Sequence, residues 1–484
     1  MAHPGHRPDQ SPCIWNANLF LSPLRPSGTG VNSVTIVALA RAEIVTASRT
    51  SIGSTIGIDF GTTNTVIAIA DPDGRTEALT FQCGGELFRV YMSSLCFWEE
   101  RRDGALHTRV EGGPWAIQQF LEGTSSHRFI QSFKTFAASR SFKETRIFRQ
   151  RFEFEDLLAT FFRTLWRKAG QSPVEVAQRI VIGRPVRFAG GRPDDALAGS
   201  RYRSAFGRLG LRDELFVYEP VGAAFFFAQR LQDDAVVLVA DFGGGTSDFS
   251  VVRFAKVAGR LKPRPLGHAG IGIAGDTFDY RIIDEVVTPQ LGKGGQYKSL
   301  GKLLPLPKGY FTNFARWNQL AMMKTSGELK ELIKLTRLAL DPEPLHKFIE
   351  IVENDLGLFL YRAVSRAKEE LSTQDRTEFR FQHADINIQQ SIMRTEFEAW
   401  IREDVDHITA TVDEALEKAD VAATEIDKVF LTGGSSLVPS IQRIFSDRFG
   451  ADRIASGDQF ESIAYGLALI GQSENLEDWI VRQW

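Results

Sequence analysis

Two segments far apart in the sequence share one pattern, and this pattern restricts what the chain can fold into. They are Thr55–Ala70 and Val236–Val252. In each, a run of apolar strand-forming residues ends in an aspartate, Asp59 or Asp241. A Phe-Gly turn with threonine then leads directly back into strand-like alternation. Because the turn is too short for a crossover helix, each segment is predicted to be a β-hairpin.

The residue types in these turns suit a phosphate. Glycine permits positive φ angles and a close approach of the backbone, and successive backbone N–H groups form an anion-binding concavity. Hydroxyl donors follow in both turns, from Thr62, Thr63 and Thr246. Asp59 and Asp241 stand where a carboxylate holds magnesium directly or through water. We therefore interpret the two turns as opposite sides of one site for a metal-bound polyphosphate.

A third element, Val429–Phe445, is a predicted strand followed by Gly433-Gly434 and then a predicted helix. Residues without side chains at the end of a strand let a flat base lie on the backbone, and a helix N-terminus suits a polar group. Each element alone also has a purely structural explanation, since glycine turns end many strands. The sequence contains no P-loop signature and no protein-kinase catalytic loop. The three elements together favour a nucleotide site of a different kind.

The length and the order of elements predict a two-lobed α/β protein. The chain has 484 residues, 43% of them hydrophobic, which is enough for two domains or lobes. Strands near longer helices indicate mixed sheets. The predicted strands are Thr55–Phe60, Val66–Ala70, Arg179–Ile182, Ala235–Ala240, Phe249–Phe254 and Lys428–Leu431, and the predicted helices are Phe154–Lys168, Pro220–Leu231, Asp355–Leu371 and Thr395–Ala419.

Changes in composition set the expected domain boundaries. Residues 1–53, rich in Pro, Ser, Gly and Arg, are predicted to be a poorly ordered extension. The first lobe is expected at 54–232. The second is expected at 233–472, with a helical subdomain inserted at about 280–370 and a short tail at 473–484. Within that insertion, Pro289–Pro307 is predicted to be an added or mobile loop because it is rich in Gly, Lys, Leu and Pro.

Charge and cysteine content exclude some classes of protein. The net charge of −3 gives no indication of a nucleic-acid or anionic-membrane surface, and no apolar run approaches the ~18 residues of a membrane span. Cys13, Cys83 and Cys96 are scattered without ligand spacing. Reduced thiols, no zinc site and a cytoplasmic location are therefore expected. We expect a monomer.

Taken in order, several motifs resemble the nucleotide-binding domain of the heat-shock protein 70 (DnaK-type) chaperones, within the actin-type ATPase superfamily. The resemblance covers about Thr55 to Gln472. The segments that carry it are Asp59–Thr65, Asp241–Asp248, Tyr218–Ala224, Ala274–Asp279, Ser365–Ser372 and Thr395–Glu398. It implies two duplicated ribonuclease H-like domains with a nucleotide cleft between them.

The resemblance also implies roles for single residues, with ATP or ADP and Mg²⁺ as cofactors. Asp59 and Asp241 would hold the metal. Lys134, Glu219, Asp241 and Thr246 would form the catalytic group, with Glu219 near the attacking water. Nucleotide contacts are implied for Gly61, Thr62, Thr63, Asn64, Gly243, Gly244, Gly245, Gly275, Lys368, Ser372, Gly433, Gly434 and Ser435. Pro185 resembles the proline that links the nucleotide state to the surface.

Departures from the family pattern fall in the purine pocket, at Ser365, Glu369, Leu437 and Phe460. Base specificity is therefore in question, whereas the phosphate clamp is kept. The sequence also ends shortly after the nucleotide domain, as in the short, YegD-like branch. The expected function is a slow Mg-dependent ATPase that acts as a chaperone or chaperone-like regulator without a peptide-binding domain, with co-chaperones or clients as partners.

Two alternatives stay open. A sugar-type kinase of the same superfamily would need a catalytic aspartate in its sugar-binding lobe, and Asp194 and Asp195 are the only candidates. A nucleotide-gated, actin-like scaffold would have little turnover.

Overall fold

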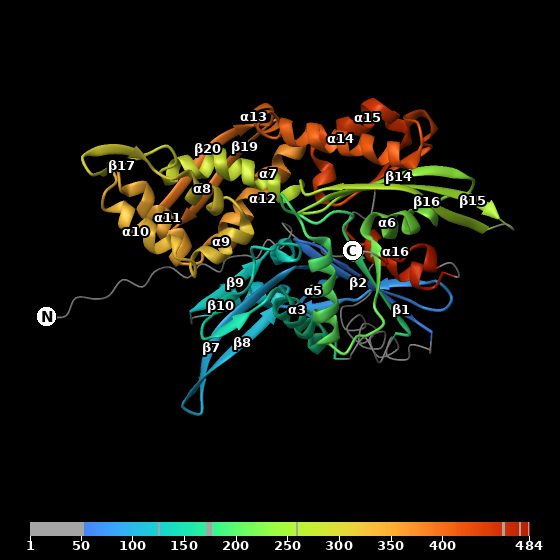
Figure 1. Ribbon diagram of the computed structural model, residues 1–484, viewed down its shortest axis with the longest axis horizontal. Coiled ribbons are helices and arrows are strands. Elements are labelled where there is room, and N and C mark those ends of the chain that lie inside the picture. Colours follow the sequence, from blue (N-terminus) through green and yellow to red (C-terminus); the bar gives the residue numbers. More distant parts are fainter. Residues whose placement is uncertain are drawn as a thin grey trace, which may run out of the picture.

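The computed structural model describes residues 53–123, 126–170, 177–257, 260–456, 460–473, 476–482 and 484. The predicted N-terminal extension lies outside these ranges apart from Gly53. The chain forms two lobes, each built on its own sheet, stacked in Figure 1 with the β1 sheet below and the β14 sheet above. This is the predicted two-lobed arrangement.

The first sheet has the strand order β13-β12-β1-β2-β3, and β6 also pairs with β2. Its central strand β1 pairs antiparallel with β2 and parallel with β12. The β1–β2 register sets Asp59 opposite Val66, so the aspartate stands beside the turn. The strands are β1 (Thr55–Phe60), β2 (Asn64–Ala70), β3 (Thr76–Ala78), β6 (Val90–Met92), β12 (Arg179–Arg184) and β13 (Leu215–Tyr218).

The second sheet, in the order β16-β15-β14-β21-β22, repeats this arrangement. Its central strand β14 pairs antiparallel with β15 and parallel with β21. Asp241 lies opposite Asp248 across the β14–β15 hairpin. Both predicted hairpins are therefore present at equivalent places in two similar sheets. The strands are β14 (Ala235–Phe242), β15 (Ser247–Val257), β16 (Arg260–Ile271), β21 (Lys428–Thr432) and β22 (Ile454–Ser456).

The other elements surround these sheets. The remaining strands are β4 (Phe81–Cys83), β5 (Glu86–Phe88), β7 (Ser94–Arg102), β8 (Ala105–Gly112), β9 (His127–Gln131), β10 (Thr145–Ile147), β11 (Gln150–Phe152), β17 (Gln296–Ser299), β18 (Lys302–Pro305), β19 (Arg376–His383) and β20 (Ile386–Met393). The α-helices are α2 (Pro114–Glu122), α3 (Phe154–Ala169), α5 (Asp195–Gly207), α6 (Glu219–Ala228), α7 (Gly275–Ile282), α8 (Lys308–Phe314), α9 (Trp317–Met323), α10 (Glu328–Thr336), α11 (Glu343–Glu353), α12 (Gly357–Thr373), α13 (Arg394–Trp400), α14 (Arg402–Ala419), α15 (Pro439–Phe449) and α16 (Ser462–Gly471).

Helices α6 and α16 join the lobes, because each packs on the sheet of the other lobe. Helix α6 follows β13 of the first sheet but contacts β14 and β15, whereas α16 follows β22 of the second sheet but contacts β1, β2 and β12. The two helices cross with their backbones in contact, since an ideal Cβ on Gly466 would lie 1.6 Å from the carbonyl oxygen of Gly222. A core cluster including Val217, Val237 and Leu467 fills the space between the sheets.

Two predictions about elements differ from the structure. The predicted helix Thr395–Ala419 is two helices, α13 and α14, that meet at Ile401. The predicted mobile loop Pro289–Pro307 contains an ordered hairpin, β17–β18, at the end of the second lobe far from the other sheet (Figure 1). Gly292, Gly294 and Gly301 have positive φ. The glycines that indicated mobility therefore form turns.

The predicted C-terminal tail packs on the first lobe in its described residues. The Val481 amide donates to the Phe216 carbonyl at 2.8 Å, and the Trp484 ring lies edge-on to the ring of Phe216. The guanidinium of Arg184 lies 4.5 Å from the centroid of the Trp484 ring. Among the described residues, no helix is both long enough and apolar enough to span a bilayer.

Candidate nucleotide site

The glycine turns of the two hairpins touch each other where the lobes meet. An ideal Cβ on Gly244 would lie 2.1 Å from Thr63 Oγ1, and one on Gly245 would lie 2.7 Å from Thr62 Oγ1. The threonines of one turn therefore occupy the space that side chains would fill on the other, so only glycine fits there. The contact also means that a polyphosphate enters between the turns only when the lobes separate.

Each turn is closed by its own backbone. The Gly61 amide donates to the Asn64 carbonyl at 2.8 Å, and the Gly243 amide donates to the Thr246 carbonyl at 3.0 Å. In the first turn, Ser93 adds two bonds, from its hydroxyl to the Gly61 carbonyl and from its amide to the Thr63 carbonyl, both 2.7 Å. The matching bonds give the two turns similar shapes, as the shared sequence pattern predicts.

A buried ion pair lies directly behind the turns. Lys134, in the short 3-10 helix Phe133–Phe136, donates from Nζ to Glu219 Oε1 at 2.7 Å. Glu219 is the first residue of α6, and both side chains are almost fully buried. The Lys134 Nζ also lies 5.9 Å from the centroid of the Phe60 ring, next to Asp59 in sequence. The structure thus brings two of the predicted catalytic residues together beside the first turn.

The two aspartates share one electrostatic environment with this pair. Burial, and next the charge of Glu219, raise the pKa of Asp59 to about 8. Burial, Glu219 and Asp59 together hold the pKa of Asp241 well above its usual value. Burial alone would lower the pKa of Lys134, but Glu219 and other neighbours raise it above its ordinary value. The carboxyl groups therefore interact with one another across the lobe boundary.

Asp248 belongs to the same cluster, although the reasoning from sequence assigned it no role. It lies opposite Asp241 on β15, and burial and Glu219 raise its pKa to about 7. Its Oδ1 accepts the backbone amides of Val186 at 2.7 Å and Arg187 at 3.3 Å. Because these residues follow Pro185, Asp248 connects the cluster to the segment that the resemblance links to the surface. Its place in the motif Asp241–Asp248 was the available signal.

The cluster suits a divalent cation. Four carboxyl groups (Asp59, Glu219, Asp241 and Asp248) repel one another, while Lys134 is bonded to only one of them. A magnesium ion would relieve this repulsion, since Mg²⁺ binds through one or two carboxylates and keeps several waters. In the described ranges, no group of three or more His, Cys, Asp or Glu side chains is placed to hold a metal by itself. Water and phosphate oxygens would supply the remaining ligands.

On the predicted adenosine side, several of the implied residues meet around Gly275. An ideal Cβ there would lie 2.7 Å from Ser435 Oγ and 3.5 Å from Lys368 Nζ. The Gly275 amide donates to the Gly243 carbonyl at 3.3 Å, and Lys368 Nζ donates to the Gly275 carbonyl at the same distance. This segment therefore adjoins the second glycine turn.

Other parts of the adenosine side differ from the expectation. The glycine pair is followed by a 3-10 turn, Gly434–Leu437, and α15 begins only at Pro439, so no α-helix N-terminus lies directly behind Gly433 and Gly434. The Ser372 hydroxyl donates within its own helix to the Lys368 carbonyl at 3.0 Å. An ideal Cβ on Gly434 would lie 3.6 Å from the Phe460 ring, which is nearly half exposed. The departures thus place an aromatic ring beside the glycine pair.

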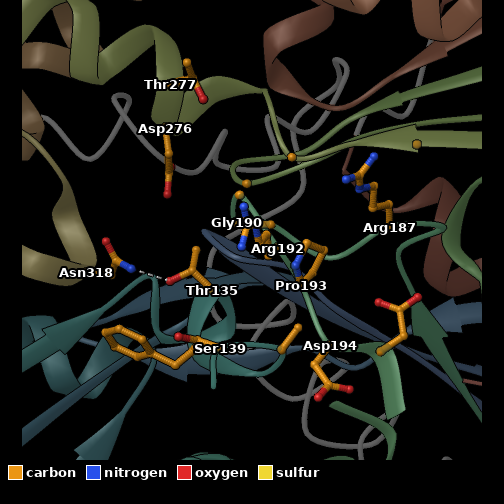
Figure 2. A pocket seen from close by; sticks show the side chains of 18 of the residues that line it. Thr135, Ser139, Arg187, Gly190, Arg192, Pro193, Asp194, Asp276, Thr277 and Asn318 are labelled. Atoms are coloured by element: carbon orange, nitrogen blue, oxygen red, sulfur yellow. Dashed lines mark hydrogen bonds between the residues drawn. The ribbon is translucent and has the colours of Figure 1, made fainter. Parts of the chain in front are cut away.

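A cavity of about 1680 Å³ lies between the lobes, and Gly245 of the second turn is among its lining residues. Figure 2 shows this cavity from close by. Thr135 and Asp194 line it from the first lobe, and Asp276 and Thr277 from the second. The Asn318 amide donates to Thr135 Oγ1 at 2.8 Å across the lobe boundary. Burial raises the pKa of Asp276 to about 7. The cavity therefore extends from the loop that precedes α5 to the second glycine turn.

The candidate kinase aspartates have structural partners in this cavity. Asp194 Oδ1 accepts the Leu197 amide as the N-cap of α5, and its Oδ2 accepts Arg140 Nε at 2.6 Å. These bonds lower the pKa of Asp194, whereas a general base works best with a pKa near the working pH. Asp195 lies 3.3 Å from the buried guanidinium of Arg184. Neither residue has the surroundings of a base that activates a sugar hydroxyl.

The architecture defines the class of protein. The chain has the two-lobed, actin-like ATPase fold. Its two sheets have equivalent strand orders, α6 and α16 each pack on the sheet of the other lobe, and each sheet has a glycine-turn hairpin with an aspartate beside the turn. The model of the Hsp70 protein family matches residues 349–475. The chaperone protein DnaK of Thermotoga petrophila is 25% identical over 424 residues, which are 86% of this chain and 58% of that protein. The chaperone protein DnaK of a Thermus thermophilus strain is 23% identical over 427 residues, 86% of this chain and 60% of that protein.

The chain is therefore similar to the Hsp70 family, by the family model over residues 349–475 and by the DnaK proteins over 86% of its length. It spans less than two thirds of the length of the curated relatives it matches. Membership of the short, YegD-like branch stays a prediction.

Proposed function

We propose that the chain binds Mg-ATP between its two glycine turns and hydrolyses it slowly. The observation that supports this most directly is the contact between the turns, with the buried Asp241 and the partly buried Asp59 sharing one acidic cluster. In this proposal, backbone amides of both turns bind the phosphates, and the hydroxyls of Thr62, Thr63 and Thr246 add donors. Phosphoryl transfer needs mainly positioning and charge neutralisation, which such a site supplies.

The residues behind the turns would complete the site. Bound magnesium would neutralise the phosphate oxygens. Glu219, fixed by Lys134, would orient the attacking water, and Lys134 would add positive charge near the γ-phosphate. Gly275, Lys368, Ser435 and the Gly433-Gly434 pair would hold the nucleoside. Because Phe460 lies beside that pair, we expect weaker discrimination between purines than a pocket with hydrogen-bonding side chains gives.

We further propose that movement of the lobes is what a protein partner senses. The turns touch in this structure, so a bound triphosphate must hold them apart, and loss of the γ-phosphate would let them approach. The relatives named chaperone protein DnaK support a chaperone or chaperone-regulating role. The two boundary segments Asp59–Asn64 and Asp241–Thr246 would then act as the nucleotide sensor.

Calorimetric titration with ATP and ADP, with and without magnesium, tests binding, and phosphate release tests turnover. Asp241→Asn should lower turnover by about 100-fold or more, a loss typical of removing one electrostatic group from an active site. Asp233→Asn, at an exposed carboxylate paired with Lys256, is the matched control and should leave turnover unchanged. No magnesium-dependent binding of either nucleotide to the unmutated protein would refute the proposal. GTP in place of ATP measures purine discrimination.

A further inference from the structure

The β17–β18 hairpin carries an apolar surface that the nucleotide site does not explain. Leu300, at its tip, is 100% exposed. Leu303 on β18 is 52% exposed, and Leu338 and Leu340, on the segment that pairs with the other side of β17, are 48% and 51% exposed. Contiguous exposed apolar side chains of this kind mark interaction sites, whereas single ones are ordinary.

Strand register places three of these leucines on one face. Lys298 lies opposite Leu303 on β18, and its amide donates to the Leu338 carbonyl at 2.9 Å. The Leu340 amide donates to the Gln296 carbonyl at 2.9 Å. Directly opposed residues in antiparallel strands share a face, so Leu303, Leu338 and Leu340 lie together around Lys298 and Gln296. We call this set, with Leu300 at the tip, the leucine face.

The opposite face of the same small sheet is partly buried, although Leu304 on it is 37% exposed. Tyr297, which pairs with Leu304 and bridges to Ala339, packs with Ala339 against the core of the second lobe. The hairpin is therefore anchored on one side, and the leucine face is held outward by the fold.

Leu300, at the tip of the hairpin, does not suit the backbone conformation there, and its side chain stabilises nothing within the folded chain. Leu300 has φ +46° and Gly301 φ +74°, so both residues of the two-residue turn have positive φ. Such turns favour Asn-Gly or Asp-Gly, because a Cβ with further branching is strained there. A fully exposed leucine in a strained position contributes little to folding. A local conflict of this kind is typical of a functional site.

The leucine face lies in a basic stretch of the chain, which is followed directly by the exposed acids Asp341 and Glu343. Residues 293–340 contain nine Lys or Arg and two Glu, a net charge of +7 in a chain whose total is −3. Lys298, Lys302 and Arg337 are exposed, and none forms an ion pair with a carboxylate of the described residues. The low net charge of the whole chain therefore does not extend to the hairpin, where Lys298 and Lys302 stand beside the leucines.

We propose that the leucine face is a docking surface for an anionic lipid bilayer. Leucine side chains need only an apolar phase, while lysine stems reach along it and keep their charge at the headgroups. Basic residues near such a surface are each attracted to anionic lipid. A protein partner is favoured less, since protein hot spots are rich in Trp, Tyr and Arg, whereas Leu and Lys are under-represented there. A single-stranded nucleic acid would need exposed aromatic rings, and Tyr297 is turned inward.

Vesicle flotation of the full chain tests the proposal. Vesicles of phosphatidylcholine alone are compared with vesicles containing roughly one third phosphatidylserine. Binding is expected only to the anionic vesicles, and it should weaken as salt rises. Leu300→Asn with Leu303→Asn should lower partitioning by about tenfold or more, given the transfer free energy of a leucine side chain. Lys298→Gln with Lys302→Gln should also weaken it.

The variants are chosen so that loss of folding does not imitate loss of binding. Asparagine suits the positive φ at position 300, so Leu300→Asn should keep or raise the melting temperature. Leu87→Asn, at a 49% exposed leucine on β5 of the other lobe, is the matched control and should bind as the unmutated protein does. Equal binding to neutral vesicles, no binding to either kind, or an equal loss in the Leu87 variant overturns the proposal. Leucine-dependent binding to poly-L-glutamate without vesicle binding would assign the face to an acidic protein instead.

Discussion

At the scale of single residues, the site depends on the buried ammonium group of Lys134, whose one close partner is the Glu219 carboxylate. The side chains of Lys134 and Glu219 are 6% and 5% exposed, so neither charge is hydrated when the other is removed. Removing one member of a buried pair leaves an uncompensated charge, which is far costlier than losing a surface pair. The pair therefore couples stability to the geometry of the proposed catalytic group.

Lys134→Met should lower the free energy of unfolding by about 3 kcal/mol because it leaves the Glu219 carboxylate buried among other acids. Adding Glu219→Gln should recover most of that loss, yet turnover should stay absent in the double variant. Urea denaturation measures the first effect and phosphate release the second. Lys256→Met, at an exposed pair with Asp233, should change stability by less than ~1 kcal/mol. A Lys134→Met protein as stable as the unmutated one would show that the ion pair is solvated.

At the scale of elements, the two hairpins position the site because their turns fit only as glycine against threonine. Gly244→Ala would put a methyl carbon 2.1 Å from Thr63 Oγ1, which forces the turns apart. We expect a larger radius of gyration by X-ray scattering without nucleotide. If the proposed site is correct, we also expect weaker ADP binding by calorimetry.

Gly207→Ala, at the end of α5, is the control for this change because an added Cβ meets nothing within 4 Å. Combining Gly244→Ala with Thr63→Gly removes the atoms that clash and should restore the unmutated scattering profile. If Gly244→Ala alone left both measurements unchanged, the turns would not limit the approach of the lobes.

The β15–β16 pair contains a histidine whose burial makes stability depend on pH. The Ser250 hydroxyl and His268 Nδ1 are 2.6 Å apart, the ring packs against Tyr218, and burial and then Lys418 lower the pKa of His268 to about 4. The unfolded chain binds this proton at about pH 6.5, so stability from this group is present above that pH. It is lost as the pH falls from 6.5 toward 4.

Between pH 7 and pH 5, His268 should therefore cost the folded state about 2 kcal/mol of stability, from ~1.4 kcal/mol for each pH unit below 6.5. His268→Phe should show a smaller decrease over the same interval when urea midpoints are compared. The comparison is a difference between two proteins, so the carboxylates common to both cancel. An equal acid dependence in both proteins would mean that His268 is protonated in the folded state.

The elements of the site could be predicted from sequence because strand periodicity and glycine turns are local signals. The hairpins around Asp59 and Asp241 were predicted from residues within about ten positions. The order of strands in the second sheet has no such local signal, since β14 pairs with β21 nearly two hundred residues later. Asp248 and the contact of Val186 with it depend on lobe packing, and so were missed. Of the two alternatives for Pro289–Pro307, an added segment or a mobile loop, mobility was wrong, because glycines in ordered turns and in mobile loops have the same composition.

At the scale of the whole molecule, charged side chains hold the lobes together away from the turns. Arg128 on β9 lies 3.8 Å from Asp355 of the second lobe, and Lys324 donates to the same carboxylate. Arg128 is almost fully buried, so Asp355 neutralises a cation from each lobe. This bridge and the Thr135–Asn318 bond lie near the two ends of α9, at Lys324 and at Asn318.

Asp355→Ala should favour the open arrangement, because Arg128 would be left buried without a carboxylate and water would enter to hydrate it. On the proposed function, ADP should then dissociate several-fold faster, which stopped-flow measurement with fluorescent ADP detects. Asp413→Ala, which breaks an ion pair within the second lobe, is the control and should leave the rate unchanged. Slower release from the Asp355 variant would show that the bridge stabilises the open form.

The glycine crossing of α6 and α16 has a mechanical consequence. Where helices interlock through ridges of side chains, a change of angle must first disengage those ridges. At Gly222 and Gly466 the backbones meet directly, so no ridges of side chains interlock at that point, and the side chain of Leu467 packs beside it. The contact between α6 and α16 at the centre of the molecule therefore resists a small rotation of one lobe relative to the other less than the contacts at the edges of the lobes do.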